Sequence, residues 1–352
     1  MEVSSLLIYR LGSLGDSLLA LPTLRMIRQV YPRARITILT NRPVDARAAP
    51  LVSTFEGTNL FDEIIRYPVG TRDIRELGKM RAEIAQRKVD LLINLNPFRG
   101  RLSALRDWLF FRWAGVKAIE GTPWNERTVA FTTDEHGRRH YEWEAARIAR
   151  RVQALMTVDL QDDRLWDLEL TAREHAQAAE LLGTEFAGGF IAASIGTKMS
   201  AKDWTVAKWR ALFQEVSARH PAAKLVLLGS RSEWRISDFC LKFWTGPKLN
   251  LCGASDPRVS AAVLSRARLF LGHDSGPMHL AATVGVPCLA VFSARNLPGQ
   301  WFPRGRSNVV IYHQVPCYGC DLERCHAHQK LCIHSISVEE VAQAAERMLG
   351  AN

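Results

Sequence analysis

The sequence predicts an α/β protein made of two doubly wound halves, each built on a parallel sheet. Three observations lead to this prediction. A length of 352 residues favours two domains over one. Short apolar runs alternate with helix-spaced apolar patterns through both halves, which is the pattern of βαβ units. A hydrophobic content of 47% allows sizeable cores and excludes a disordered chain.

In the first half, strands and helices are expected to alternate. Leu18, Leu21 and Leu24 recur at helical spacing within an expected helix from Ser17 to Val30. Tyr31-Pro32 ends this helix, because the residue before a proline avoids helical backbone angles. The expected strands are Leu6–Arg10, Arg35–Leu39, Ile64–Tyr67 and Leu91–Asn94, with a helix from about Arg72 to Arg87.

The second half repeats this order. The expected strands are Phe190–Ile195, Lys224–Leu228, Leu269–Gly272 and Pro287–Phe292, and the expected helices are Val206–Arg219, Ala261–Arg266 and Val338–Leu349. The acidic stretch 159–167 is the candidate linker, so we expect domains of residues 1–165 and 166–352 and leave open whether the final helix packs back on the first domain. Two such halves facing each other place a ligand cleft between the carboxyl ends of their strands.

The net charge of +10 favours anionic partners, such as nucleic acid, acidic lipid or phosphorylated substrates. The longest apolar runs are strand-sized, and the first six residues lack the basic region of a signal peptide. We therefore expect a cytoplasmic protein without a transmembrane helix. In a reducing cytosol its cysteines are thiols or metal ligands, and Cys240, Cys252 and Cys288 are expected to be buried.

Four further cysteines, Cys317, Cys320, Cys325 and Cys332, cluster near the C-terminus. They contain one Cys-x-x-Cys pair, but the second pair is spaced irregularly compared with zinc ribbons. Reduced thiols in a compact loop are favoured over a structural metal, so we expect no metal site. The cluster and the basic charge also raise the hypothesis of a zinc-containing nucleic-acid-binding protein. The sequence contains no recognition-helix pattern or aromatic RNA-binding motif, and we expect no nucleic-acid partner.

The stretch 272–282 is the most informative in the chain, because it predicts a strand, a tight turn and a helix of small residues. Small residues let a ligand approach the backbone closely. The free N–H groups at a helix start attract an anion such as a diphosphate. Asp274 and His279 flank that position with a hydrogen-bond acceptor and a titratable donor. The alternative is a βα turn in which Asp274 and Ser275 only cap the helix.

A second glycine-rich turn, 10–16, ends in Asp16. Its spacing differs from both the dinucleotide fingerprint and the P-loop, which argues against NAD and P-loop chemistry. Asp16 at the start of a helix is either a helix cap or a base that accepts a proton from a hydroxyl nucleophile.

Charged residues follow other expected strands. Lys198 and Lys202 could neutralise a leaving diphosphate, and Glu233 could hold ribose hydroxyls. Arg99 and Arg101 lie in a loop suited to an anion. Solvated surface charge is the alternative for each. The basic and aromatic stretch 108–113 fits either a membrane surface or a core helix with outward arginines, and we favour the core helix.

Taken together, these residues resemble glycosyltransferase family 9, the heptosyltransferase family. The likeness spans essentially the whole chain, in the same order. It is carried by Arg10–Asp16 followed by Leu21-Pro22, by Lys202-Asp203-Trp204, by Asp274–Ala282, and by the cysteine-rich segment leading into Ile336–Val341.

The resemblance implies a GT-B fold, with an N-terminal acceptor domain and a C-terminal nucleotide-sugar domain. It implies inverting sugar transfer without metal or cofactor, most often from ADP-heptose, to a lipopolysaccharide core precursor at the cytoplasmic face of the inner membrane. The site residues that it implies are Asp16 as base, Lys202, Ser275 and Gly276 at the diphosphate, and Asp274 near the donor sugar. To these we add our own expectations: His279 at the diphosphate; Glu233 and Thr197, with Asp274, at the sugar or nucleotide; and Gly15, Arg99 and Arg101 at the acceptor.

The chain departs from the family pattern at three places. Ser275 stands where Thr is commoner, Pro277-Met278 follows Gly276, and the loop 96–98 lacks the usual Asp-x-Gln-Gly pattern. These departures concern the sugar and the acceptor more than the reaction class. Two alternatives therefore stay open: a transferase that uses another nucleotide sugar for a different surface polysaccharide, and a non-catalytic nucleotide-sugar-binding protein.

Overall fold

The structure is a computed structural model that describes residues 3–42, 51–68, 70–124, 131–133 and 139–350. It divides into two compact units, the first made of Met1–Thr132 with Glu142–Trp166 and the second of Thr133–Tyr141 with Asp167–Asn352. The segment Thr133–Tyr141 lies in the second unit, where Tyr141 N donates to Pro298 O over 2.7 Å. No helix among the described residues is long and apolar enough to cross a membrane.

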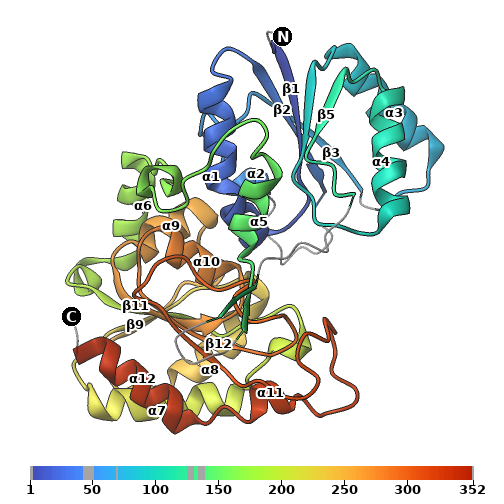
Figure 1. Cartoon of the computed structure of the whole chain (residues 1–352). Helices are drawn as coiled ribbons and strands as arrows, with labels where there is room; N and C mark the ends of the chain where they lie inside the picture. The colour runs from blue at the N-terminus through green and yellow to red at the C-terminus, as the bar shows by residue number, and fades with distance from the viewer. Residues whose placement is uncertain (1–2, 43–50, 69, 125–130, 134–138, 351–352) are drawn as a thin grey trace. The chain divides into compact units, whose positions relative to one another are not determined.

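The first unit is built on a five-stranded parallel sheet of order β3-β2-β1-β4-β5 (Figure 1). The chain winds outward from β1 on one side and from β4 on the other, so the strand order reverses between these two strands. The elements are β1 (Ser5–Tyr9), α1 (Leu14–Val30), β2 (Arg35–Asn41), α2 (Leu51–Thr54), β3 (Glu63–Tyr67), α3 (Ile74–Gln86), β4 (Leu91–Asn94), α4 (Arg101–Trp113), β5 (Ala118–Glu120) and α5 (Glu144–Arg151).

The second unit repeats this design with six parallel strands of order β10-β9-β8-β11-β12-β13. Here the strand order reverses between β8 and β11. The elements are β8 (Phe190–Ser194), α6 (Ala172–Leu182), α7 (Val206–Arg219), β9 (Leu225–Leu227), α8 (Trp234–Leu241), β10 (Lys248–Asn250), α9 (Pro257–Leu264), β11 (Ala267–His273), α10 (Gly276–Thr283), β12 (Cys288–Phe292), β13 (Val309–Tyr312), α11 (Leu331–His334) and α12 (Val338–Gly350). A separate two-stranded sheet pairs β6 (Phe131–Thr133) with β7 (Arg139–Tyr141). The prediction of two doubly wound parallel-sheet units is confirmed.

Two helices begin earlier than the apolar spacing predicts, because polar caps extend them. Helix α1 starts at Leu14 rather than Ser17, with Ser13 and Asp16 forming a capping box. Helix α9 starts at Pro257 rather than Ala261, because the Asp256 side chain accepts from the N–H groups of the next turn.

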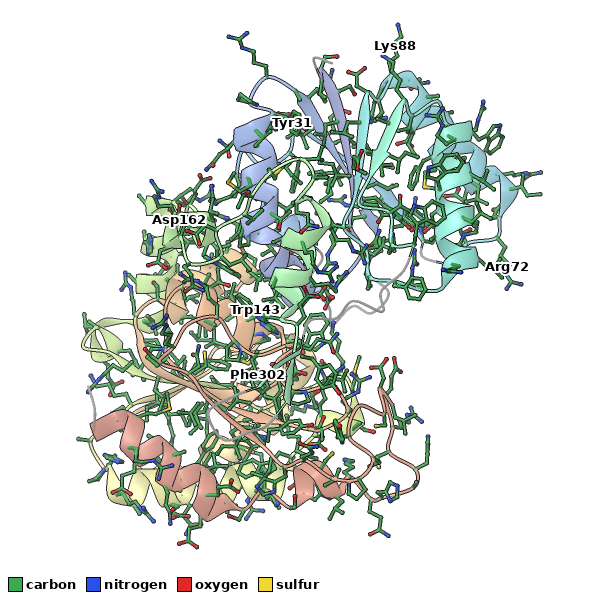
Figure 2. All side chains as sticks on the ribbon, viewed as in Figure 1. Tyr31, Arg72, Lys88, Trp143, Asp162 and Phe302 are labelled. Carbon is green, nitrogen blue, oxygen red and sulfur yellow. The ribbon has the colours of Figure 1, made fainter. Side chains whose placement is uncertain are left out.

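The expected linker 159–167 is packed rather than loose. It contains a 3-10 helix, Asp163–Trp166, that contacts α1, and its Trp166 is buried. Trp166 stacks on Trp143, which is labelled in Figure 2, with ring centroids 5.4 Å apart. The final helix α12 packs on α7 and on β11 and β12, inside the second unit.

Helix α4 packs one face on the core, as expected for 108–113, and exposes the other. Phe111 and Ala104 are buried, and Phe111 joins the core formed with Tyr9 of β1. The opposite face carries Leu109 and Trp113, which are exposed. Because both faces carry apolar residues, the composition of the segment does not show which face is buried and which is exposed.

The core of the second unit includes a buried histidine that the sequence did not single out. His273, at the end of β11, is fully buried, and its Nε2 accepts from Trp204 N at 3.1 Å and from Trp209 Nε1 at 3.2 Å. Because Nε2 only accepts, the ring is neutral with its proton on Nδ1. Burial lowers the pKa of His273 to about 4. His273 thus fixes the loop after β8 to the end of β11.

We predict that His273 makes the protein less stable in acid. An unfolded imidazole binds a proton near pH 6.5, so between about pH 6.5 and pH 4 the unfolded state binds more protons than the folded state. Stability is therefore lost as the pH falls through this range, by about 2 kcal/mol between pH 7 and pH 4.5. His273→Gln keeps a hydrogen-bond acceptor that does not bind a proton in this range. Measured by denaturant unfolding at pH 7 and pH 4.5, its loss of unfolding free energy should be smaller than that of wild type by about 2 kcal/mol.

The matched control is His326→Gln, because His326 is exposed in the same unit. It should keep the wild-type pH dependence. If His273→Gln and wild type lost the same unfolding free energy on acidification, the assignment of this loss to His273 would be wrong.

Candidate active site

The loops after β1 and β4 meet where the strand order of the first unit reverses, and Arg10 joins them. Its guanidinium is fully buried; Nη1 donates to Leu95 O at 2.7 Å and Nη2 to Asp16 O at 3.0 Å. Nη2 also lies 3.3 Å from Glu144 Oε1. Burial alone would raise the pKa of Glu144, but the guanidiniums of Arg147 and Arg10 hold it below its usual value. The charges at this edge are therefore paired and fixed in place.

Asp16 lies in the first turn of α1, with its side chain about one third exposed. Its Oδ2 accepts from Ser13 N at 2.9 Å and from Ser13 Oγ at 3.0 Å, and its Oδ1 lies 3.9 Å from Arg10 Nη2. The structure therefore contains the helix cap that the sequence offered as one interpretation. It leaves Oδ1, held only by a longer ion pair among the described contacts, as the oxygen able to take a proton. Gly15 is buried in the same turn.

Gly12 is required for this geometry. Its φ is +149°, and a Cβ at this position would meet Asp16 Cβ at 2.3 Å. Its N–H donates to Asn41 Oδ1 at 2.9 Å, which ties the turn to the end of β2. A side chain at residue 12 would therefore displace Asp16.

Arg99 and Arg101 follow β4, which neighbours β1 in the sheet. Arg99 donates to Asp107 Oδ2 at 2.9 Å and to Tyr9 Oη at 3.5 Å, and Arg106 also donates to Asp107, at 2.7 Å. One carboxylate thus serves two guanidiniums, which leaves a positive excess beside the loop. Arg101 is exposed at the start of α4.

In the second unit, Lys202 and Asp274 meet where the strand order reverses. Lys202 lies after β8 and Asp274 after β11, and Lys202 Nζ lies 2.6 Å from Asp274 Oδ2. Both are largely buried, with 14% and 7% of their side chains exposed. His279 Nε2 lies 4.0 Å from Asp274 Oδ1. Residues predicted from two separate motifs are therefore brought together.

The start of α10 has donors that the fold does not use. Ser275 is the N-cap residue, but its side chain accepts no cap hydrogen bond, and its buried Oγ has no partner among the described residues. The cap alternative for Ser275 is therefore wrong. Gly276 opens the helix and Pro277 has no N–H group to satisfy. A buried hydroxyl and backbone N–H groups at a helix start form a surrounding suited to an anion.

Glu233 and Thr197 lie at the same edge of this sheet. Glu233 Oε2 accepts from Ser230 N at 2.6 Å and so caps the turn after β9. Its Oε1 lies against the backbone after β8, because a Cβ on Gly196 would meet it at 1.8 Å. Thr197 Oγ1 accepts from Met199 N at 3.4 Å and shapes the loop that carries Lys202. The predicted donor residues thus share one edge.

The four clustered cysteines lie in the segment after β13. They are free thiols, and the described residues contain no group of three or more histidine, cysteine or acidic side chains placed to hold a metal ion. The hydrogen bond that Lys330 N donates to Cys325 Sγ, at 3.3 Å, and those from neighbouring backbone N–H groups lower the pKa of that thiol.

Sequence reasoning missed Arg10, Glu144, Asn96 and His273 as site-forming residues. Arg10 directly follows the buried strand β1 and His273 is the last residue of β11, so a polar residue at the end of an apolar run was the available signal. Asn96 Oδ1 accepts from Leu11 N at 2.7 Å and links the same two loops as Arg10. Glu144 lies 48 residues after Asn96, and no local sequence pattern distinguishes it.

Comparison with known proteins identifies relatives of the chain. Residues 79–331 match the model of glycosyltransferase family 9 (heptosyltransferase). A segment of 172 residues is 30% identical to lipopolysaccharide heptosyltransferase 1 of Pseudomonas aeruginosa, covering 44% of this chain and 46% of that protein. The chain therefore matches about half the length of this curated relative.

Two solved structures share the fold over nearly their whole length. A glycosyl transferase family 9 protein from Veillonella parvula gives a TM-score of 0.72 at 20% identity, covering 100% of this chain and 99% of that one. The ADP-heptose lipopolysaccharide heptosyltransferase II of E. coli gives 0.65 at 16% identity, covering 99% of both. The fold is the GT-B fold that the resemblance implied. Because the family model covers more than half of the chain, this protein belongs to glycosyltransferase family 9.

Proposed function

We propose that this protein transfers heptose from ADP-heptose to a lipopolysaccharide core precursor, with inversion at the anomeric carbon and without a metal ion. The observation that carries the proposal is the start of α10, where the buried Ser275 Oγ, without a partner among the described residues, directly follows Asp274, whose Oδ2 is paired with Lys202. Family membership and the relatives' names support the sugar and the donor.

The second unit would bind the donor. The diphosphate would accept hydrogen bonds from Ser275 Oγ and from the backbone N–H groups of Gly276 and Met278. Lys202 would share its charge between Asp274 and the leaving group. Charge grows on the diphosphate as the glycosidic bond breaks, so fixed positive groups there stabilise the transition state more than the bound donor. Glu233 Oε1 would accept from ribose hydroxyls, and Thr197 and His279 would line the donor.

The first unit would bind the acceptor and supply the base. The acceptor oxygen forms a bond to the anomeric carbon from the face opposite the diphosphate, its proton passes to Asp16 Oδ1, and the nucleoside diphosphate leaves with the bonding electrons. Gly15, Arg99 and Arg101 would position a phosphorylated acceptor, because the loop after β4 has a positive excess. Such an acceptor belongs to a lipid, so we place the reaction at the cytoplasmic face of the inner membrane.

The test of this function uses a panel of nucleotide sugars. ADP-heptose should raise the unfolding temperature of the protein more than UDP- or GDP-sugars do, since a ligand at 100 times its Kd stabilises by about 2.7 kcal/mol. Transfer to a deacylated core acceptor should persist in excess EDTA, because Lys202 and the α10 amides would supply the positive charge. Binding without transfer to any acceptor would favour the non-catalytic alternative. Protection by a different nucleotide sugar would favour the other-polysaccharide alternative.

Asp16→Asn should abolish turnover but keep the helix cap. Asn retains an oxygen that accepts from Ser13 N, but it cannot take a proton. Loss of a general base slows the chemical step by roughly 100- to 10,000-fold, so kcat should fall by that factor while ADP-heptose protects the variant as it does the wild type. Asp73→Asn changes the analogous cap of α3 in the same unit and should leave kcat unchanged. Retained turnover in Asp16→Asn would remove Asp16 as the base.

Ser275→Ala should weaken donor binding without destabilising the free protein. Ser275 Oγ makes no cap hydrogen bond, so its removal costs the fold little. A hydrogen bond to a charged group contributes about 1.5–3 kcal/mol, so the Kd for ADP should rise about tenfold or more, as measured by titration calorimetry. The control is Ser265→Ala, whose hydroxyl donates to Ala262 O elsewhere in the unit. Equal ADP affinity in both variants would contradict the diphosphate assignment.

A further inference from the structure

Helix α4 presents a stripe of large apolar side chains to solvent. Leu102, Leu105, Leu109 and Trp113, here called the α4 stripe, are 84%, 43%, 52% and 60% exposed. Spacings of three, four and four residues place them along one face of the helix. Exposed apolar residues scattered singly are ordinary, but an unbroken stripe along three turns of one helix indicates an interaction surface.

The stripe is not part of the core on which α4 folds. Ala104 and Phe111, on the opposite face, are buried at 4% and 3% exposure, and they hold the helix on the sheet of the first unit. The stripe can therefore contact a partner without any unfolding of this unit.

Arginines border the stripe on both sides. On helical spacing, Arg106 lies on one side and Arg101 and Arg112 on the other, and all three are exposed. The guanidinium of Arg112 donates to Val116 O at 2.8 Å, with no acidic partner among the described residues. At the end of the helix, Arg81 of α3 lies 4.5 Å from the ring centroid of Trp113. The border of the stripe is thus cationic.

The positive charge extends to the neighbouring helix α3, which contacts α4. Residues 72–117 hold eleven basic and five acidic side chains, which is more than half of the net excess of the whole chain. Arg72 and Lys88, at the two ends of α3, point outward in Figure 2. Of the nearby acidic groups, Asp107 is already shared by Arg99 and Arg106, and Glu76 is paired with Lys79. The surface around the stripe therefore attracts an anionic partner.

We propose that the α4 stripe docks the first unit on an anionic lipid bilayer, with α4 lying in the plane of the headgroups. An interfacial helix needs an apolar face bordered by basic side chains, and α4 has both. Arginine stems can follow the apolar region while their guanidiniums reach lipid phosphates, and tryptophan favours the membrane–water boundary. A protein partner that covers a single helix face flanked by cations would need an acidic groove of matching length, whereas a bilayer needs no such shape.

This proposal deepens the proposed function, because it names the surface through which the enzyme would reach a lipid-borne acceptor. The loop with Arg99 leads directly into α4, whose first residue is Arg101, so docking would bring both arginines to headgroup depth. Membrane docking can nevertheless be tested separately from sugar transfer, because the vesicles used contain neither donor nor acceptor.

The experiment measures cosedimentation of the full chain with vesicles of phosphatidylcholine containing phosphatidylglycerol. Wild type should bind these vesicles, bind pure phosphatidylcholine at least tenfold more weakly, and be released by high salt. Leu102→Gln/Leu109→Gln should reduce binding at least tenfold. The control, Leu322→Gln/Leu331→Gln, removes two leucines of the second unit that are 42% and 52% exposed and should bind like wild type.

Both double variants should unfold at the wild-type temperature, because all four side chains are exposed. Equal vesicle binding by wild type and Leu102→Gln/Leu109→Gln would overturn the proposal, as would a wild type that binds no vesicles. Concentration-dependent dimers in sedimentation velocity that disappear in Leu102→Gln/Leu109→Gln would instead assign the stripe to a second copy of the chain. Transfer to a deacylated, soluble acceptor reports on the proposed function separately and should be the same in this variant and wild type.

Discussion

The site-forming edge of the first unit depends on one buried cation. Arg10 is removed from water completely, and a buried guanidinium is costly unless it is paired and hydrogen-bonded. Its acceptors lie on three separate elements: the loop after β4, the first turn of α1, and the start of α5, where Glu144 supplies the counter-charge. Moving any of these elements away would cost a buried hydrogen bond, so they are held in a single arrangement. Asp16 takes its position from that arrangement.

The second unit solves the same problem with a neutral group. A parallel sheet brings the loops after β8 and β11 together where the strand order reverses, but backbone pairing ends there and cannot hold them. His273 supplies the connection by accepting two N–H groups from the segment around Trp204. That connection places Lys202 against Asp274. Burial favours the neutral form of His273 because it penalises the charged ring, and only the neutral ring can accept these two bonds.

Most elements, and several residues that the structure brings together at the candidate site, could be predicted from the sequence because they rest on local patterns. Short apolar runs predicted the strands, and the glycine-containing turns that follow two of them pointed to Asp16 and Asp274. The early starts of α1 and α9 could not be predicted from apolar spacing, because polar caps set them. Glu144 could not be predicted either, because its role arises from a fold contact with a residue 134 positions away. The exposed face of α4 could not be predicted, because apolar residues lie on both faces of the helix. The sequence alone does not show which of these leucines and phenylalanines are buried.

The same distinction applies to charge. The net charge of +10 is a property of the sequence, but its meaning depends on which cations the fold neutralises. Arg10 and Arg258 are buried and paired with carboxylates, so they hold loops in place and attract little from outside. Arg101 and Arg112 are exposed, with no acidic partner among the described residues, and act on the surroundings. Charge that organises the site and charge that attracts a distant partner are therefore carried by different residues, even though Arg99 and Arg101 stand only two positions apart.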